Sequence, residues 1–215
     1  MPSFPSELQS ERGAVGHLIL AVRFLTIVPV PGREAAGPAA LGRAAWWFPA
    51  VGLALGACLV AADHLFAVVF PPRLGSILLV SLWKILTGGI HLDGLADVLD
   101  GLSGRDADRR LAPLLIGPLF PAAAPGQGTG ASFLEGLSPW AAPVSIVGLW
   151  ILSAVLLGPW GGLLLSLVLA VVLLWAVFLA SRLGGLTGDA LGSSVELAEL
   201  ATLVAAAALI HLRVL

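Results

Sequence analysis

Residues 161–180 read GGLLLSLVLAVVLLWAVFLA, a run without a single charged side chain. A helix of about 20 such residues can cross a bilayer, because all its backbone hydrogen bonds are made within the segment. The rest of the chain has the same character: 58% of its 215 residues are hydrophobic and 11% are charged, whereas about 25% are charged in soluble domains. This pattern indicates a helical integral membrane protein.

Six segments have the apolar character of membrane helices. They are residues 17–30, 44–70, 74–86, 141–157, 161–180 and 195–212. The first is short and carries Arg23, so we expect it to lie in the interface or to span at a tilt. The expected fold is therefore all-α, a polytopic membrane bundle of about 5–6 hydrophobic helices. We expect residues 1–215 to form a single membrane-embedded domain, with 1–16 as a polar N-terminal tail.

One further apolar piece, residues 111–124, does not fit this pattern. It has about 14 residues, too few to span, and its three prolines break a regular helix. We expect it to enter the membrane and return, or to lie in the interface. Residues 111–139 are thus predicted to be a shortened, irregular region.

The composition also excludes several classes of protein. The formal net charge is −2 and no basic stripe is present, so nucleic acid is not an expected partner. A disulfide framework is excluded because Cys58 is the only cysteine. The N-terminus lacks the basic and apolar regions of a cleaved signal peptide, so we expect insertion through the spans themselves.

The arginines predict the orientation of the chain in the membrane. They flank the spans on one side at positions 33, 43, 105, 109, 110 and 182, with Arg73 on the other side. Positively charged loops tend to face the cytoplasm. We therefore expect a multi-pass protein of the cell inner membrane, with segments 87–110 and 182–199 on the cytoplasmic face.

The segment 87–101, TGGIHLDGLADVLDG, concentrates acids at the end of an apolar run. Asp93, Asp97 and Asp100 are spaced i, i+4, i+7, which places them on one helical face. Like charges at this spacing repel and destabilise the helix. A bound divalent cation would remove this repulsion. Mg²⁺ suits such a face, since it binds one or two carboxylates together with substrate phosphates. The alternative is a solvated loop after a span.

Two basic residues accompany these acids. His91 is not on the acidic face of a continuous helix, but a bend at Gly88–Gly89 would allow it to orient a carboxylate or to act as an acid or base. Lys84 lies within the third apolar segment and is a candidate for contact with an anionic substrate group. The structural alternatives are a histidine at a span end and a lysine that reaches to the interface.

A second segment, 184–199, has the same design. Its sequence GGLTGDALGSSVELAE repeats the pattern G-G-x-x-x-D, with Asp189 in the place of Asp93. Glu196 and Glu199 follow at the start of an apolar helix. Two acid-bearing elements on one side of the membrane predict a shared site. Stabilisation of a helix N-terminus by these carboxylates, and a chance repeat, remain open alternatives.

Several motifs resemble one family. TGGIHLDGLADVLDG, followed by SGRDADRRL, is similar to the signature of cobalamin synthase, or adenosylcobinamide-GDP ribazoletransferase. RLGGLTGDALGSSVELAEL resembles its C-terminal signature, and FLTIVPVP with WWFPAVGLALG resembles its N-terminal part. The resemblance implies a Mg²⁺-dependent membrane enzyme of the last step of cobalamin assembly. Such enzymes join adenosylcobinamide-GDP to α-ribazole or α-ribazole 5′-phosphate and release GMP.

The resemblance implies roles for the candidate residues. Asp93, Asp97 and Asp100 would bind Mg²⁺ and the diphosphate, and His91 would assist removal of a proton from the attacking hydroxyl. The proposed substrate-binding residues are Lys84, Arg105, Arg109, Asp189, Glu196 and Glu199. The expected partners are these substrates and the lipid bilayer. A homo-oligomer, or a complex with other cobalamin-pathway enzymes, is left open.

The chain departs from the family pattern in its middle. After the basic stretch the family carries an Asp-Ser-Arg motif with a glycine-rich turn, and then a pair of spans. Here Arg110 leads through 111–124 directly to APGQGTGASFLEGL. We therefore expect an internal segment to be missing after about residue 111, and with it part of the pocket.

Other functions are weighed against this one. An inactive relative would only join a membrane complex. A CDP-alcohol phosphotransferase also carries Asp on one helical face, but its pattern has Ala-Arg where Leu102 and Ser103 follow Gly101 here. A transporter would carry acids within its spans, whereas these acids lie at span ends.

Overall fold

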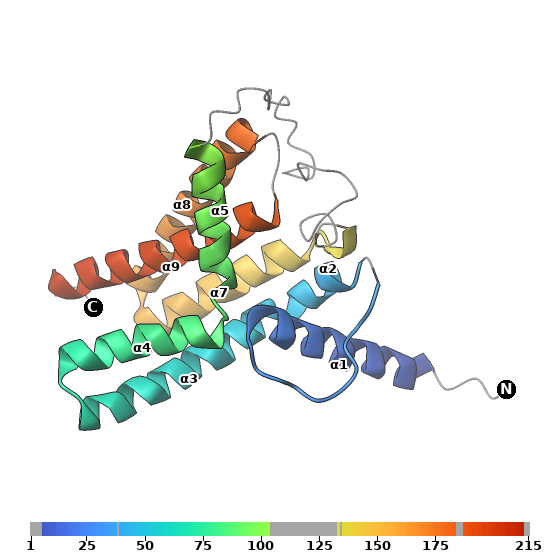
Figure 1. Ribbon diagram of the computed structural model, residues 1–215, viewed down its shortest axis with the longest axis horizontal. Coiled ribbons are helices and arrows are strands. Elements are labelled where there is room, and N and C mark those ends of the chain that lie inside the picture. Colours follow the sequence, from blue (N-terminus) through green and yellow to red (C-terminus); the bar gives the residue numbers. More distant parts are fainter. Residues whose placement is uncertain (1–5, 38, 104–132, 134, 184–186, 213–215) are drawn as a thin grey trace. The chain divides into compact units, whose positions relative to one another are not determined.

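The computed structural model describes residues 6–37, 39–103, 133, 135–183 and 187–212. Within that part of the chain all regular elements are helices (Figure 1), which confirms the expected all-α fold. The chain divides into two compact units, Met1–Gly89 with Glu135–Ser138 and Ile90–Leu134 with Pro139–Leu215. Each unit is described by itself. That 1–215 form a single domain stays a prediction.

Residues 6–37 and 39–89 of the first unit are mainly helical. Their helical elements are α1 (Ser6–Leu25), α2 (Ala40–Ala44), the 3₁₀ helix η1 (Ala45–Trp47), α3 (Phe48–Val69) and α4 (Pro72–Leu86). The helices α3 and α4 lie side by side as a hairpin (Figure 1), and α4 begins at Pro72, since proline is well suited to the first helical turn. Three buried side chains, Ala21, Ala44 and Val51, form the core where α1 meets α2 and α3.

The first helix differs from its expected bounds. It begins at Ser6, inside the stretch expected to be a polar tail, and ends at Leu25 rather than near residue 30. Pro29 and Pro31 explain the early end, because the residue before a proline is kept out of the helical region. After the helix, the Thr26 hydroxyl donates to the Val22 carbonyl at 2.8 Å.

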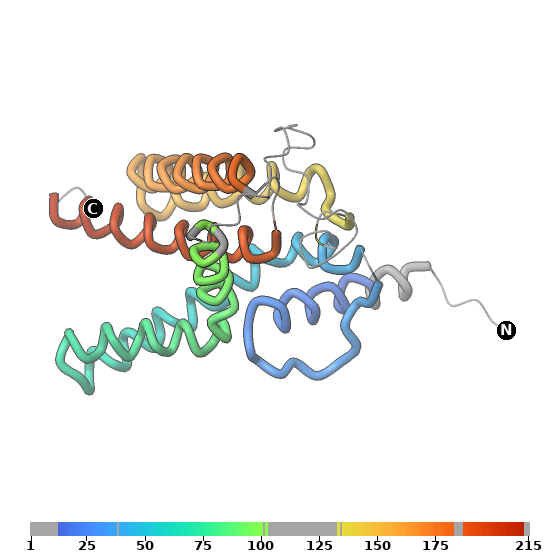
Figure 2. Tube along the Cα trace, turned by 45° about the horizontal axis from the view of Figure 1, so that its top comes forward, coloured from blue at the N-terminus to red at the C-terminus, as the bar shows by residue number. Residues whose placement is uncertain are grey.

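The second unit holds α5 (Ile90–Ser103), α7 (Ala141–Leu157), α8 (Pro159–Leu183) and α9 (Gly188–His211). The hairpin expected around 158–162 is present, with Gly158 between α7 and α8 at a φ of 64° that favours glycine. Helix α9 packs along α8, and α5 crosses α9 (Figures 1 and 2). Their shared core is Val98, Leu179 and Ala190.

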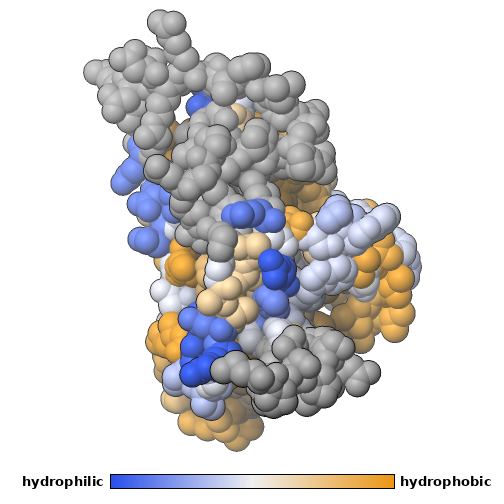
Figure 3. Space-filling model, turned by 90° about the vertical axis from the view of Figure 1, so that its right-hand side faces the viewer, coloured by the Kyte–Doolittle hydropathy of each residue, from blue (hydrophilic) through white to orange (hydrophobic). Residues whose placement is uncertain are grey.

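Several helices have the length and apolarity of membrane spans. Among the described residues, three helical segments are long and apolar enough to cross a membrane: Ala40–Val69, Pro159–Arg182 and Gly188–His211. A fourth is added if α4 and α5 are counted together as one broken span. Val68 and Leu174 are 85% and 70% exposed, as are many other large apolar side chains. Figure 3 shows hydrophobic patches beside hydrophilic ones on one face of the molecule. Such apolar surface requires an apolar surrounding, and a lipid bilayer supplies it. The membrane character expected from the sequence is confirmed.

Candidate functional site

The acidic segment begins at a glycine break. Helix α4 ends at Leu86 and α5 begins at Ile90, and Gly88 and Gly89 between them have φ values of 66° and 65°. Consecutive left-handed residues suit glycine alone, so the bend expected from the sequence is present. The buried Thr87 hydroxyl donates to the Trp83 carbonyl at 3.2 Å and fixes the last turn of α4.

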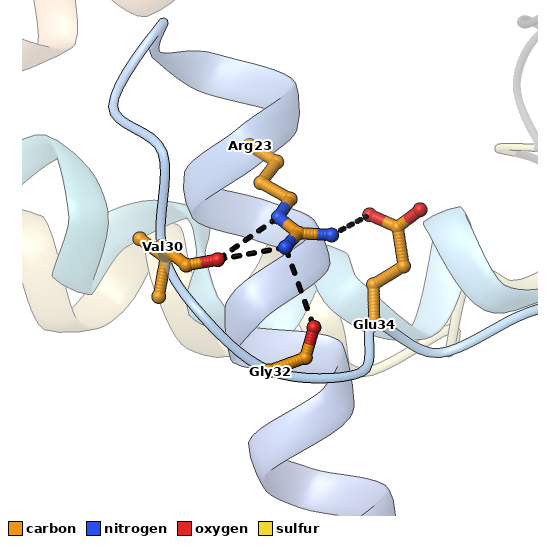
Figure 4. Close-up of polar contacts among 4 residues, drawn as sticks. All are labelled: Arg23, Val30, Gly32 and Glu34. Carbon is orange, nitrogen blue, oxygen red and sulfur yellow. Dashed lines mark hydrogen bonds and ion pairs between the residues drawn. The ribbon is translucent and has the colours of Figure 1, made fainter.

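The loop after α1 supports this break. The Ile27 backbone N–H donates to the Leu86 carbonyl at 2.9 Å, and a Cβ at Gly88 would lie 2.8 Å from the Ile27 side chain. Arg23 holds the loop in place from α1 (Figure 4). Its guanidinium donates to the Val30 carbonyl at 2.7 and 3.2 Å, to the Gly32 carbonyl at 3.3 Å and to the Glu34 carboxylate at 3.3 Å. Arg23 is therefore an anchor for the loop.

Helix α5 presents distinct faces. Gly94 and Val98 are buried, four residues apart, on the face that packs against α9. Asp93, Asp97 and Asp100 are exposed and share another face. The helical spacing predicted for the three acids is thus present, and the packed residues leave all three side chains outside the core.

His91 lies on the packed face and not on the acidic one. Because the break ends at Gly89, His91 and Asp93 belong to one continuous helix. The glycine break therefore leaves His91 off the face of the acids, and its role as an acid or base stays a prediction. Its side chain is half-buried, and its backbone lies beside Gly192 of α9, where a Cβ would be 3.4 Å from the His91 Cα.

Two glycines bring α5 and α9 into backbone contact. A Cβ at Gly94 would lie 3.1 Å from the Asp189 carbonyl oxygen and 3.2 Å from its Cα, and Gly192 faces both His91 and Gly94. Small residues at a helix crossing allow such close approach. The crossing therefore places the start of α9, with Asp189, beside the middle of α5, so the two acid-bearing motifs do meet.

The acids of α9 continue from this crossing. Asp189, Glu196 and Glu199 are spaced i, i+7, i+10, which puts them on the helical face that includes Gly192. Asp189 is exposed, whereas Glu196 and Glu199 are half-buried. Thr187 caps the start of α9, because its side chain accepts a hydrogen bond from the Ala190 N–H at 3.1 Å. Both helices of this crossing thus carry carboxylates, those of α5 on the face beside the packed one.

The remaining candidates lie elsewhere. Lys84 belongs to the first unit, on α4, where it is half-buried and its ammonium is 5.1 Å from the centre of the Trp83 ring. Arg105 and Arg109 are outside the described residues.

The carboxylates of α5 and α9 are the candidate ligands of Mg²⁺. Within the described ranges, no three His, Cys, Asp or Glu side chains stand close enough together to hold a metal ion by themselves. The donors of α5 are nevertheless all carboxylates, exposed on one face. They fit the usual mode of Mg²⁺, which takes one or two carboxylates, several waters and substrate phosphates.

Comparison with known proteins identifies the family. The family described as cobalamin-5-phosphate synthase matches residues 17–115 and 110–207, which hold both acidic motifs. The chain belongs to this family. No solved structure matches the chain.

Relatives in the cobalamin-5-phosphate synthase family cover nearly the whole chain. The adenosylcobinamide-GDP ribazoletransferase of Pseudomonas aeruginosa (strain UCBPP-PA14) is 36% identical over 91% of this chain and 99% of its own length. The enzymes of the same name from Thiobacillus denitrificans and Roseiflexus sp. (strain RS-1) are 34% and 31% identical over 88% and 85% of this chain.

The comparison also locates the shortened middle. The Pseudomonas alignment runs over 245 positions, although 91% of 215 residues is about 196. Several tens of positions of the Pseudomonas enzyme are therefore aligned with gaps in this chain. The two stretches that match the family meet at residues 110–115, which agrees with a segment missing after about residue 111.

Sequence reasoning missed the residues that position the acids. These are Gly94 and Gly192 at the helix crossing, and Arg23 with its loop. The two glycines stand inside the motifs, directly after Asp93 and three residues after Asp189. A glycine within a helical pattern points to close packing, so a signal was present. For Arg23, the signal in the sequence was the acidic Glu34 shortly after the helix, which is a possible ion-pair partner.

Proposed function

We propose that this chain is an adenosylcobinamide-GDP ribazoletransferase, the enzyme of the final assembly step of cobalamin biosynthesis. The family match across both acidic motifs carries the proposal. The substrates are adenosylcobinamide-GDP and α-ribazole or its 5′-phosphate. A hydroxyl of the ribazole attacks a phosphorus of the diphosphate, one P–O bond forms, and the P–O bond to the leaving GMP breaks.

Asp93, Asp97 and Asp100 are the proposed site for Mg²⁺. Their exposure on one face of α5, away from the buried Gly94 and Val98, supports this role. When bound there together with the diphosphate oxygens, Mg²⁺ would neutralise charge on the transferred and leaving groups.

His91 is the proposed acceptor of the proton from the attacking hydroxyl. It stands on the same helix as the three aspartates, half-buried at the crossing with α9. A base held in this way keeps its orientation when the substrate binds. Asp189, Glu196 and Glu199 then line the substrate side of α9, where carboxylates can accept hydrogen bonds from ribose hydroxyls.

Basic side chains complete the proposed site. Lys84, Arg105 and Arg109 would neutralise the diphosphate and the leaving GMP. The basic residues Arg33, Arg43 and Arg182 support an active site on the cytoplasmic side of the membrane.

The test is turnover by the purified chain. In detergent or lipid with Mg²⁺, adenosylcobinamide-GDP and α-ribazole, we expect release of GMP and formation of a corrinoid product. Asp97→Asn should abolish Mg²⁺-dependent turnover. The matched control is Asp63→Asn, which removes an exposed carboxylate of α3 and should leave turnover unchanged. Absence of GMP when the Pseudomonas enzyme is active alongside would overturn the proposal, and full activity of Asp97→Asn would remove that residue from the site.

A further inference from the structure

We propose that an open groove of the first unit binds the phosphate headgroup of an anionic phospholipid. The groove has a volume of about 550 Å³ and lies between α1 and the segment formed by α2 and η1. Its lining residues are Gly13, Ala14, His17, Arg43, Trp46 and Trp47. It is separate from the acidic crossing of α5 and α9, and the proposal is independent of the transferase reaction.

The walls of the groove are held by the core of the unit. On one side, Trp47 packs against the buried cluster of Ala21, Ala44 and Val51. On the other side, Gly13 and Ala14 are one helical turn before His17 on α1, and such small side chains leave room for a ligand. The groove is thus formed by the fold and does not depend on a flexible loop.

The charge of the groove suits a phosphate. Arg43 is exposed and His17 is half-buried. The acid of the preceding loop, Glu34, is paired with Arg23 at 3.3 Å. A guanidinium can donate two parallel hydrogen bonds to one phosphate, and this geometry makes arginine the preferred partner of that group.

The position of the groove selects a lipid as the source of the phosphate. Arg43, Trp46 and Trp47 stand at the beginning of Ala40–Val69, a candidate span of 30 residues. The start of a span lies at the level of the headgroups, where tryptophan is enriched because it is apolar with one polar edge. Trp46 is 43% exposed, so its ring is available to cover the glycerol region of a lipid.

The test measures lipid binding to the full chain in detergent. Dioleoyl-phosphatidylglycerol and dioleoyl-phosphatidylcholine are titrated separately, and retained lipid is counted by native mass spectrometry with tryptophan emission as a second readout. We expect phosphatidylglycerol to bind at least about ten-fold more tightly. Arg43→Gln should weaken it about five-fold, the effect of one basic residue at an anionic membrane surface. The matched control Arg73→Gln removes an exposed arginine outside the groove and should change nothing.

Three results would overturn the proposal. Equal affinity for the two lipids would show that the phosphate charge is not recognised. An equal loss in the Arg43 and Arg73 variants would show general attraction instead of a site. Displacement of the lipid by inorganic phosphate or by α-ribazole 5′-phosphate at lower concentration than the lipid itself would assign the groove to a soluble phosphate. GMP release by the same preparations is measured separately, so a failure here leaves the transferase proposal unaffected.

Discussion

Removal of the Arg23 side chain should release the loop that supports the glycine break. The guanidinium makes three hydrogen bonds to the Val30 and Gly32 carbonyls and an ion pair with Glu34. A hydrogen bond from a charged donor contributes about 1.5–3 kcal/mol when buried, and an exposed ion pair about 0–1 kcal/mol. Because the two side chains are 36% and 46% exposed, we expect Arg23→Ala to cost about 2 kcal/mol of loop stability.

Hydrogen exchange measured by mass spectrometry in lipid nanodiscs can report this cost. The Ile27 and Ala35 N–H groups are bonded to the Leu86 and Gly16 carbonyls at 2.9 and 3.0 Å, so they exchange only when the loop opens. A loss of about 2 kcal/mol should raise their exchange about thirty-fold. Peptides from α7 should exchange as in the wild type.

Two further variants separate the carbonyl contacts from the ion pair. Glu34→Gln removes only the pair and should raise exchange by less than about three-fold. Arg23→Lys retains the charge but not the planar fork, and should recover only part of the loss. If Glu34→Gln were as damaging as Arg23→Ala, the ion pair and not the two carbonyls would anchor the loop, and the reasoning above would be wrong.

Further variants test the helix contacts of the second unit. Gly94→Leu should push α5 away from α9, lower the free energy of unfolding by about 1–3 kcal/mol through overpacking and reduce GMP release. Gly94→Ala should have smaller effects. Thermal unfolding measures the stability of each variant, and GMP release measures its turnover. Ser193→Ala should cost about 1–3 kcal/mol, because the buried Ser193 hydroxyl accepts the Trp175 indole N–H at 3.0 Å. Ser194→Ala, the matched control, should cost less, and equal losses would refute the role of that bond. Thr187→Ala should cost about 1 kcal/mol by loss of the helix cap, seen as faster exchange at the start of α9.

The positions of the long helices could be predicted because apolar length is a direct signal. The expected segments 141–157 and 161–180 correspond to α7 and α8. Helix ends were less predictable: the last helix begins at Gly188 and not near residue 195. Its first two turns carry Asp189 and small polar residues, which lower hydropathy without preventing a helix, and the Thr187 cap fixes the start.

The acidic face of α5 could be predicted, and its relation to α9 only in part. Spacing alone places Asp93, Asp97 and Asp100 together, since the period of a helix is fixed. The repeat of the two motifs indicated a shared site, but not which residues would touch. Contact depends on the faces that two helices present to each other, and that is set by tertiary packing of Gly94 against Asp189.

The α5–α9 contact also explains how the acidic motifs can stay together in a chain with a shortened middle. The closest approaches lie in α5 and in the first turns of α9, with His91, Gly94 and Val98 on one helix and Asp189, Ala190 and Gly192 on the other. None of them belongs to residues 110–115, where the two stretches that match the family meet. The crossing therefore forms from residues outside that stretch, and the aspartates of α5 keep the helix that orients them.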